Sequence, residues 1–528
     1  MHLRDCAQKS HIVLDRQVSI TDAVAIIDHG ISIELHPDAV ARCVAAHQRL
    51  QQVIAEDRHV YGLTTGFGPL ANRLVDTSSG ALLQQNLVHH LASGVGPALG
   101  WRAARAMVFA RLMSILQGAS GASELAINAL IKLINSELAP EVPSQGTVGA
   151  SGDLTPLAHM VLCFQGRGAF FDKAGRFYHS QNGLDQLGIA PLDLAQRDGL
   201  ALVNGTSAMT GIAVLNADLA GRAVGWSIAL TAAMAEVQNA RTEAWHPAFG
   251  TLRPHARQIE TAGLLRAALV GSERVERRCL ADRILTDVPR QTEERAGQDA
   301  YTLRCAPQVI GAVWDMLDWH NQVVTTELNA VTDNPIFPLP HDDGPLVLHG
   351  GNFMGQHVGL ASDALATGVC VLAGFAERQM ARLTDETLNR GLPAFLHQGV
   401  GGLNSGLMGA QVTATALVAE MRTQGAASAQ SISTNGANQD VVSMGTIAAR
   451  HVQHKLDMLM RVQAILALSM AQAIDIRSQD QTGLSFSPVA LKLQAYVRGI
   501  SAPLTQDRPL GRDIEAIAKA FAQDAPPS

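Results

Sequence analysis

The sequence predicts a mainly α fold, built on a bundle of long helices with a smaller mixed region at the N-terminus. Of the 528 residues, 47% are hydrophobic but only 4% are aromatic, so the core must consist of Ala, Leu, Val, Ile and Met. That composition favours close-packed helices over sheet. Three long stretches, at about 306–330, 353–384 and 440–476, have the apolar spacing of helices. In the last stretch only Gln463 interrupts an apolar stripe typical of a bundle core, made of Ala449, Val452, Leu456, Leu459, Leu466, Met470 and Ala473.

The N-terminal 60 residues have a mixed α/β pattern. Residues 11–14 are expected to form a short strand, and residues 40–55 a helix. Residues 61–68 then form a glycine-rich loop, Tyr-Gly-Leu-Thr-Thr-Gly-Phe-Gly, which predicts irregular backbone.

Alanine-rich sequence follows over residues 101–138 and predicts one or two helices, with breaks at Gly118 and Gly121. Residues 164–198 are richer in glycine and polar residues and predict strands and turns. A long helix is then expected to open at Leu200 and to reach about residue 238.

Charge and cysteine usage argue against several classes of protein. The formal net charge is −7 and Lys and Arg are scattered, so no nucleic-acid partner is expected. The six cysteines form no CxxC pair, which indicates reduced thiols in a cytoplasmic protein and no zinc site. No signal peptide is expected, and no apolar stretch reaches the roughly 20 residues of a membrane span.

Small residues crowd into the stretch 146–157, Gly-Thr-Val-Gly-Ala-Ser-Gly-Asp-Leu-Thr-Pro-Leu. Here Thr155 and Pro156 are expected to be the N-cap and the first residue of a helix. The amide nitrogen of Gly152 could attack the carbonyl carbon of Ala150 and close a five-membered ring. Loss of water from the ring and from Ser151 would leave a methylidene-imidazolone, a strong electrophile.

Two other interpretations of this stretch are open. It could be an ordinary glycine-rich loop before a helix. It could also bind phosphate, but neither GxxxxGK[ST] nor GxGxxG is present.

The full string resembles the signature of the aromatic amino acid ammonia-lyases, the family of histidine, phenylalanine and tyrosine ammonia-lyases. The resemblance runs from about residue 20 to 515, through at least seven motifs in the family's order. It implies the ammonia-lyase (fumarase/aspartase-like) type of long-helix bundle. It also implies a homotetramer in which each active site takes residues from three subunits.

The resemblance also divides the chain into two regions. Residues 1–200 would carry the Tyr61 loop and the prosthetic group, formed autocatalytically from Ala150, Ser151 and Gly152. Residues 201–528 would carry the long helices and the remaining site residues, including Asn204, Tyr301, Arg304 and the pocket floor.

Two motifs of the chain match catalytic positions of the family. A lone Tyr in a loop is usually a surface residue, but Tyr61 matches the family's catalytic base. An Asn-Gly pair is usually just a turn. In Leu-Val-Asn-Gly-Thr, however, Asn204 matches the residue that donates a hydrogen bond to the imidazolone oxygen.

A third motif lies at residues 298–304, Gln-Asp-Ala-Tyr-Thr-Leu-Arg. Tyr301 and Arg304 are three residues apart and would share one face of a helical turn. Such an Arg is often part of a surface ion pair. The family instead places a Tyr by the prosthetic group and an Arg on the substrate carboxylate, with Gln298 nearby.

His89 and His90 could suggest a metal site, but adjacent helical residues point about 100° apart and do not easily chelate one ion. In the family this position selects the substrate, and His90-Leu91 matches its tyrosine-specific members. The resemblance then places His90 at the phenol oxygen. Four apolar side chains would wall the substrate ring: Leu91, Leu154, Phe353 and Met408.

A polar cluster at residues 431–440 resembles the family's pocket floor, which implies substrate-binding roles for Asn435, Asn438 and Gln439. The chain has one residue more than the family pattern before Asn438, so the individual roles stay open. Glu420 matches a Glu near the substrate amine, and it could equally be an ordinary surface carboxylate.

The implied activity is non-oxidative elimination of ammonia from L-tyrosine to give trans-4-coumarate, without a metal or a diffusible cofactor. Histidine or phenylalanine could also be substrates, and the same site could act as a tyrosine aminomutase. From another class, the chain could be a non-catalytic helical assembly protein. A fumarase-type lyase is disfavoured because the GSSxMPxKxN loop is absent.

Overall fold

The computed structural model describes residues 10–282, 298–338, 344–480 and 482–528. The chain forms two compact units. Unit 1 comprises residues 1–218, 320–363 and 426–451, and unit 2 comprises residues 219–319, 364–425 and 452–528. Four of the five unit boundaries fall inside the four longest helices described, which are α9 (Ser207–Val237), α13 (Ala306–Leu328), α14 (Gln356–Thr384) and α16 (Gly445–Arg477). The fifth, between residues 425 and 426, lies between helices.

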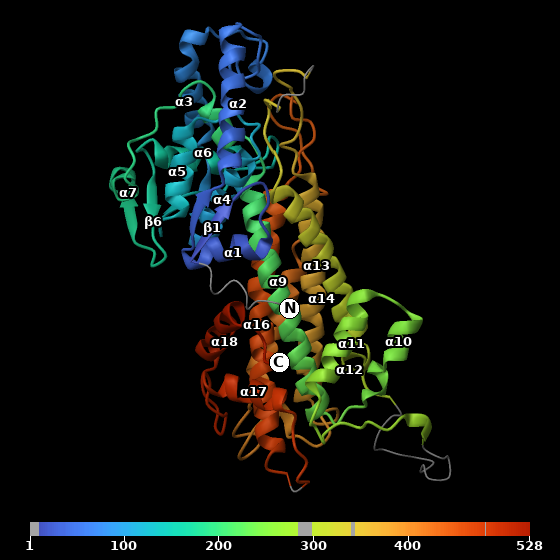
Figure 1. Cartoon of the computed structure of the whole chain (residues 1–528). Helices are drawn as coiled ribbons and strands as arrows, with labels where there is room; N and C mark the ends of the chain where they lie inside the picture. The colour runs from blue at the N-terminus through green and yellow to red at the C-terminus, as the bar shows by residue number, and fades with distance from the viewer. Residues whose placement is uncertain (1–9, 283–297, 339–343, 481) are drawn as a thin grey trace. The chain divides into compact units, whose positions relative to one another are not determined.

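Unit 1 contains short strands as well as helices (Figure 1). Strand β1 (His11–Leu14) pairs in parallel with β2 (Ser32–Leu35), with His11 opposite Ser32. These two strands are joined by α1 (Ile20–His29). Two further antiparallel sheets have the strand orders β3-β5 and β4-β6-β7: β3 (Val95–Ala98), β4 (Ala139–Pro140), β5 (Pro143–Gln145), β6 (Ala169–Phe171) and β7 (Phe177–His179).

Helix α4 (Trp101–Leu116) runs through the core of unit 1, and nearly every residue from Ala103 to Leu116 is buried. Within this buried stretch the polar side chains are Arg105, Arg111 and Ser114, and the rest is apolar. The other helices of this part of the chain are α2 (Pro37–Ala55), α3 (Gly80–Leu91), α5 (Glu124–Ile134), α6 (Leu154–Phe164), α7 (Ser180–Leu187) and α8 (Asp198–Val203).

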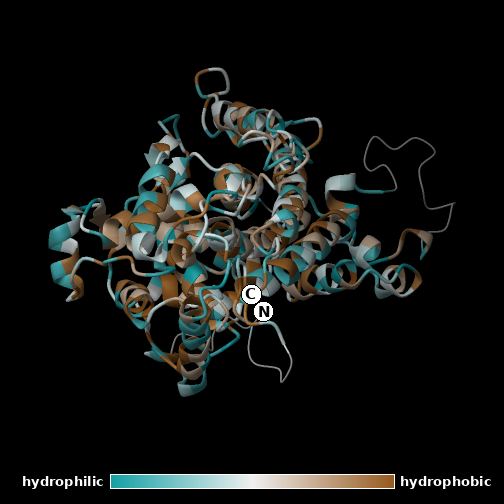
Figure 2. Ribbon diagram, turned by 90° about the horizontal axis from the view of Figure 1, so that it is seen from above, coloured by the Kyte–Doolittle hydropathy of each residue, from teal (hydrophilic) through white to brown (hydrophobic). Residues whose placement is uncertain are grey.

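Unit 2 has one continuous core made by the C-terminal part of α9 together with α13, α14 and α16 and shorter helices around them. Trp226 stacks on Phe521 in this core, with ring centroids 3.6 Å apart. Figure 2 shows apolar residues spread along the helices. The shorter helices are α10 (Pro247–Leu252), α11 (Ala256–Ala268), α12 (Tyr301–Arg304), α15 (Met408–Arg422), α17 (Pro488–Arg498) and α18 (Gly511–Gln523).

The α16 stripe is buried as predicted, with each of its seven apolar residues at most 1% exposed. Gln463, the exception in the stripe, is also buried. Its amide nitrogen donates hydrogen bonds to the Ala223 carbonyl and to the Ser227 hydroxyl at 2.8 and 2.9 Å. The buried amide nitrogen is therefore satisfied by α9, while the amide oxygen has no hydrogen-bond partner among the described residues.

Helices α14 and α16 are long and apolar enough to meet a length and composition criterion for membrane spans. However, 67% and 83% of their most apolar windows are buried inside the protein. Core packing therefore accounts for their hydropathy.

The mainly α fold is confirmed, but one predicted helix was wrong at its start. The long helix expected from Leu200 is two helices, α8 and α9, separated at Asn204–Thr206. The break exists because Gly205 has a φ of +141° and lies between other backbone segments, a conformation that a continuous helix cannot contain.

Candidate active site

The turn over residues 146–152 has a left-handed backbone that favours glycine at three positions. Gly146, Gly149 and Gly152 have φ angles of +134°, +72° and +71°. A Cβ atom on Gly152 would collide with the carbonyl of Gly205. The Thr147 hydroxyl accepts a hydrogen bond from the Gly149 amide at 3.1 Å and can donate one to the Gly152 carbonyl at 3.2 Å. The turn is therefore tightly closed.

A segment almost 300 residues later in the chain holds this turn from outside. The Met444 amide donates to the Val148 carbonyl at 2.9 Å. The Ser443 hydroxyl donates to the Gly149 carbonyl at 3.2 Å. The backbone of the turn is thus fixed by long-range contacts as well as by its own glycines.

Polar side chains from two other segments reach Ser151. The Asn204 amide nitrogen donates to the Ser151 carbonyl oxygen at 3.2 Å. The Gln439 amide nitrogen donates to the Ser151 hydroxyl at 3.2 Å, and its amide oxygen accepts from Asn435 at 2.8 Å. Two of the predicted site residues thus contact the predicted ring-forming serine, and a third, Asn435, holds one of them.

These residues fit the ring proposed from the sequence. Ala150 and Gly152 already form a backbone bridge with each other. If Gly152 nitrogen joined the Ala150 carbonyl carbon, the Ser151 carbonyl would remain as the ring oxygen, at the atom that Asn204 contacts. The Asn204 amide oxygen is buried and has no hydrogen-bond partner among the described residues, so it can still accept one.

Asp153, which the sequence analysis missed, anchors the turn to α9 and to Thr446. It is fully buried, and its carboxylate accepts hydrogen bonds from the Met209 amide at 2.8 Å and from the Thr446 hydroxyl. Burial raises the pKa of this carboxyl to about 6. The carboxylate thus caps the N-terminus of α9, where negative charge is favourable.

The predicted start of the next helix was wrong. Helix α6 begins at Leu154 with Asp153 in the N-cap position, and not with Thr155 as cap and Pro156 first. The Asp153 side chain makes no capping bond to α6, since it is engaged by α9 and Thr446.

Tyr61 is half-buried in its loop. Its hydroxyl accepts a hydrogen bond from the Gly68 amide at 2.9 Å, and its ring packs edge-on against Phe67. Its backbone amide donates to the His349 ring at 3.2 Å. The Tyr61 hydroxyl is thus hydrogen-bonded within its own loop.

His90 and its neighbours lie on other parts of unit 1. His90 is exposed at the C-terminal end of α3, and its Nδ1 is 2.9 Å from the Asn86 carbonyl oxygen. Leu91 and Leu154 are half-buried and pack against the unit 1 core. Phe353 is half-buried, and the Asn438 amide donates to the Asn435 carbonyl at 3.1 Å.

The third predicted motif lies in unit 2. The Arg304 guanidinium donates to the Gln298 amide oxygen at 2.5 Å and stacks over the Tyr301 ring at 4.6 Å. Tyr301 is 69% exposed. Asp299 is buried and pairs with Arg390 at 2.6 Å, which anchors the segment that presents these side chains.

Met408 and Glu420 belong to α15 of unit 2, where Met408 is the first helical residue. Glu420 is exposed, and its carboxylate lies 3.8 Å from the His454 ring. Among the described residues, no group of three or more His, Cys, Asp or Glu is placed to hold a metal ion.

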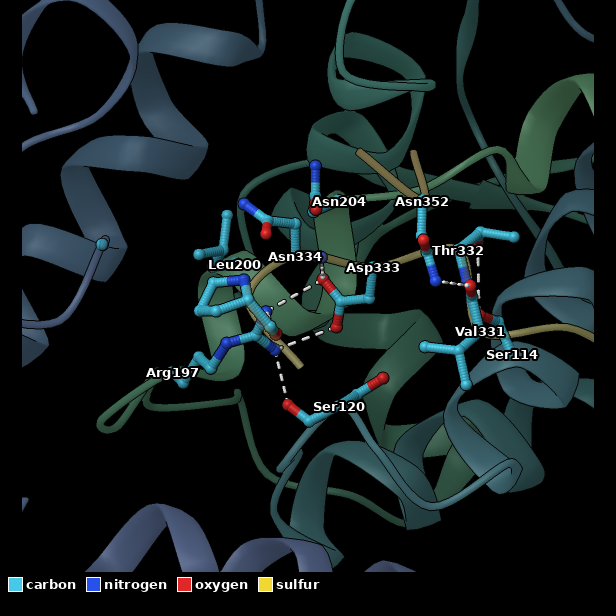
Figure 3. A network of polar contacts seen from close by, with 12 residues as sticks. Ser114, Ser120, Arg197, Leu200, Asn204, Val331, Thr332, Asp333, Asn334 and Asn352 are labelled. Atoms are coloured by element: carbon cyan, nitrogen blue, oxygen red, sulfur yellow. Dashed lines mark hydrogen bonds and ion pairs between the residues drawn. The ribbon is translucent and has the colours of Figure 1, made fainter. Parts of the chain in front are cut away.

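A buried ion pair, which sequence reasoning also missed, supports α8 immediately before Asn204 (Figure 3). Arg197 and Asp333 have fully buried side chains 2.9 Å apart. Arg197 also donates to the carbonyls of Ser120 and Pro335, at 2.5 and 2.8 Å. These contacts join the residue that precedes α8, the helix leading to Asn204, to the segments at Ser120 and at 333–335.

Comparison with known proteins places this geometry in a family. The profile of the aromatic amino acid lyases matches residues 18–498. A tyrosine ammonia-lyase of Cereibacter sphaeroides is 60% identical over 98% of both chains. A histidine ammonia-lyase of Symbiobacterium thermophilum is 38% identical over 96% of both chains.

Among solved structures, the tyrosine aminomutase of Streptomyces globisporus matches with a TM-score of 0.90 and 35% identity, over 97% of both chains. Its likeness confirms the long-helix fold type predicted from the sequence. With a family profile matching most of its length and relatives similar over nearly all of it, this chain belongs to the aromatic amino acid lyase family.

Proposed function

We propose that the chain is a tyrosine ammonia-lyase, which converts L-tyrosine to trans-4-coumarate and ammonia without oxidation. The observation that carries this proposal is the Ser151 turn, closed by Gly152 and contacted at the Ser151 carbonyl by Asn204. The choice of tyrosine is supported by His90-Leu91 and by the relative that is 60% identical.

The methylidene-imidazolone formed from Ala150, Ser151 and Gly152 would supply an electrophile for the substrate amine. Asn204 would hold the ring oxygen, and Gln439 lies beside the hydroxyl that is lost. Asp153 and Thr147 keep the turn closed. No diffusible cofactor is part of this proposal.

The remaining residues bind the substrate and move its proton. Tyr61 removes the β-proton of the substrate. Arg304 binds the carboxylate through two parallel hydrogen bonds, and Tyr301 lies by the prosthetic group. His90 meets the phenol oxygen. The other proposed contacts are Leu91, Leu154, Gln298, Phe353, Met408, Glu420, Asn435, Asn438 and Gln439.

We also propose a cytoplasmic homotetramer in which each site takes residues from several subunits. The support is an exposed apolar surface on and before α15, where Leu403, Met408 and Val412 are 80%, 42% and 64% exposed. Contiguous exposed apolar patches mark sites at which other proteins bind.

A second candidate function is that of a tyrosine aminomutase, which returns ammonia to the β-carbon. The solved tyrosine aminomutase with its TM-score of 0.90 favours keeping this candidate. Chiral analysis of the products formed from L-tyrosine separates the two activities, since only the mutase gives a β-amino acid.

The test uses purified full-length protein. Its intact mass should be lower than that of the sequence by two waters, and tyrosine should give 4-coumarate, detected by its ultraviolet absorbance. Phenylalanine and histidine are assayed in parallel, and Ser151→Ala should lose both the mass deficit and the activity while staying folded. A wild-type protein with the full sequence mass, or an active Ser151→Ala variant, would contradict the proposal.

A further inference from the structure

Arg111 on α4 is a fully buried arginine placed beneath the proposed active-site turn. Its side chain donates one hydrogen bond to the Asn204 carbonyl and another to the Ser114 hydroxyl, the latter at 3.1 Å. Its Nε has no hydrogen-bond partner among the described residues. Burial lowers the pKa of this guanidinium to about 10.

Direct ion pairing does not account for this buried cation. The negative charge that acts on Arg111 is Asp333, but the carboxylate of Asp333 accepts from Arg197 at 2.9 Å and from the Asn334 amide at 2.7 Å, and Arg197 itself repels Arg111. A buried charge without its own counter-ion is costly. Such a group is therefore a candidate for a role in the site, provided that the geometry supports one.

The geometry is a stack of three layers, with Arg111 at the bottom and the Asn204–Gly205 peptide in the middle. A Cβ atom on Gly205 would lie 2.5 Å from the Arg111 guanidinium and 2.6 Å from the Thr332 hydroxyl, so the peptide rests directly on these groups. Figure 3 shows Ser114, Thr332 and Asn204 in this region.

The upper layer is the Ser151 turn. Asn204 donates to the Ser151 carbonyl at 3.2 Å, Gly205 pairs with Gly152, and the Asp153 amide donates to the Gly205 carbonyl at 2.7 Å. The middle layer is therefore contacted by Arg111 on one side and by the ring-forming residues on the other.

We infer that Arg111 is a positioning residue, which holds the Asn204–Gly205 peptide against Ser151 and favours negative charge on the Ser151 carbonyl oxygen. This inference rests on the proposed function. When Ser151 loses water, its Cα–H and Cβ–O bonds break and a Cα=Cβ double bond forms. The proton and the hydroxide leave together as water. Negative charge gathers on the Ser151 carbonyl oxygen as the proton leaves, and oriented donors stabilise it there.

The chain provides a matched control on the same helix. Arg105 is also buried, and burial also lowers its pKa to about 10. Its guanidinium donates to the carbonyls of Ile134, Ser136 and Leu138 at 2.7, 2.6 and 2.9 Å. Arg105 thus makes similar buried hydrogen bonds to carbonyl groups at the end of α5, without a contact to Asn204.

The experiment compares Arg111→Met, Arg111→Lys and Arg105→Met in the full-length protein, by intact mass, melting temperature and kcat/KM. Arg105→Met should lower the melting temperature but keep the two-water mass deficit. Arg111→Met should accumulate unmodified chains, and kcat/KM per modified chain should fall by roughly a hundredfold, the scale for lost oxyanion support.

Arg111→Lys supplies a second readout, the pH dependence of kcat/KM, which should not change if Arg111 is purely structural. Burial lowers the pKa of a lysine amine, so this variant should lose its positive charge as pH rises. Its kcat/KM should then fall relative to wild type toward alkaline pH, and it decides the matter if Arg111→Met does not fold.

The inference is overturned if Arg111→Met carries the full mass deficit and loses no more kcat/KM than Arg105→Met, or if Arg111→Lys follows the wild-type pH profile. A wild-type protein without the mass deficit would instead contradict the proposed function, so the two failures are distinguishable.

Discussion

At the residue scale, the chemistry depends on which atoms face Ser151. Its carbonyl meets Asn204 and its hydroxyl meets Gln439, so each oxygen already has a donor from a different segment. The residues proposed to bind the substrate are less enclosed within one chain. His90 in unit 1 and Tyr301 in unit 2 are both exposed.

His90→Phe should invert the substrate preference. With phenylalanine bound, the polar His90 ring has no phenol oxygen to meet, which should cost about 1–3 kcal/mol and favour tyrosine about tenfold to a hundredfold. The variant should favour phenylalanine, because tyrosine would then bury a hydroxyl without a partner. Measuring kcat/KM for both substrates on both proteins tests this. A variant that still prefers tyrosine would show that His90 does not contact the para position.

Arg304→Lys should lower kcat/KM by roughly 1.5–3 kcal/mol, since lysine keeps the charge but loses the fork that grips a carboxylate. Arg257→Lys is the control. Arg257 likewise stacks on an aromatic ring, that of Trp314 at 4.4 Å, and its fork binds Asp318. The control should leave kcat/KM unchanged. Equal kinetics for wild type and Arg304→Lys would place the carboxylate site elsewhere.

At the element scale, the sequence predicted what lies within one continuous stretch. The apolar stripe of α16 and the strand at residues 11–14 required only local pattern, and both are confirmed. The break between α8 and α9 has a local signal in Asn204-Gly205, but its position is fixed by the packing of Gly205 against Arg111 and Thr332, which are far away in the chain. The N-cap of α6 was missed for the same kind of reason.

Helix α13 carries a buried histidine, His320, whose pKa burial lowers to about 4. Between about pH 6.5 and 4 the unfolded chain binds a proton that the folded chain does not, so the free energy of unfolding rises with pH and is lost on acidification. His320→Met removes this group. From pH 7 to pH 5, wild type should lose about 2 kcal/mol more than the variant.

Denaturant unfolding of wild type and His320→Met between pH 7 and pH 5 gives the difference in their free energies of unfolding. Asp153 has the opposite dependence, because a raised carboxyl pKa makes the folded chain less stable as pH rises. That contribution is common to both proteins and cancels in the difference. If the free energies of unfolding of the two proteins changed in parallel with pH, protonation of His320 in the folded chain would cost no free energy.

At the scale of the whole molecule, the proposed site residues are divided between two units, with Ser151 in unit 1 and Arg304 in unit 2. The sequence motifs were enough to propose these residues, since each motif is contiguous. They could not give Asp153, Arg197 or Asp333 a role, because these act through partners far away in the chain.

Shared sites predict that two inactive variants can complement each other. Co-expressed Ser151→Ala and Arg304→Met chains should form mixed oligomers in which some sites have both an intact Ser151 and an intact Arg304. Activity should then exceed that of either variant alone. Ser151→Ala with Asn204→Ala is the control, because these residues touch within one chain and no site regains both. Absence of complementation, with mixed oligomers verified by mass, would rule out shared sites.

The contacts of segment 439–446 with the Ser151 turn have a consequence for the synthesis of the protein on the ribosome. Gln439, Ser443, Met444 and Thr446 all touch the turn or its anchor Asp153. A ribosome makes these residues long after it has made Ser151. A nascent chain that stops before residue 446 therefore lacks the clamp that shapes the turn, and on the proposed chemistry the electrophile matures only once synthesis is nearly finished. Its reactive carbon is then withheld from cellular thiols and amines until there is a folded protein to enclose it.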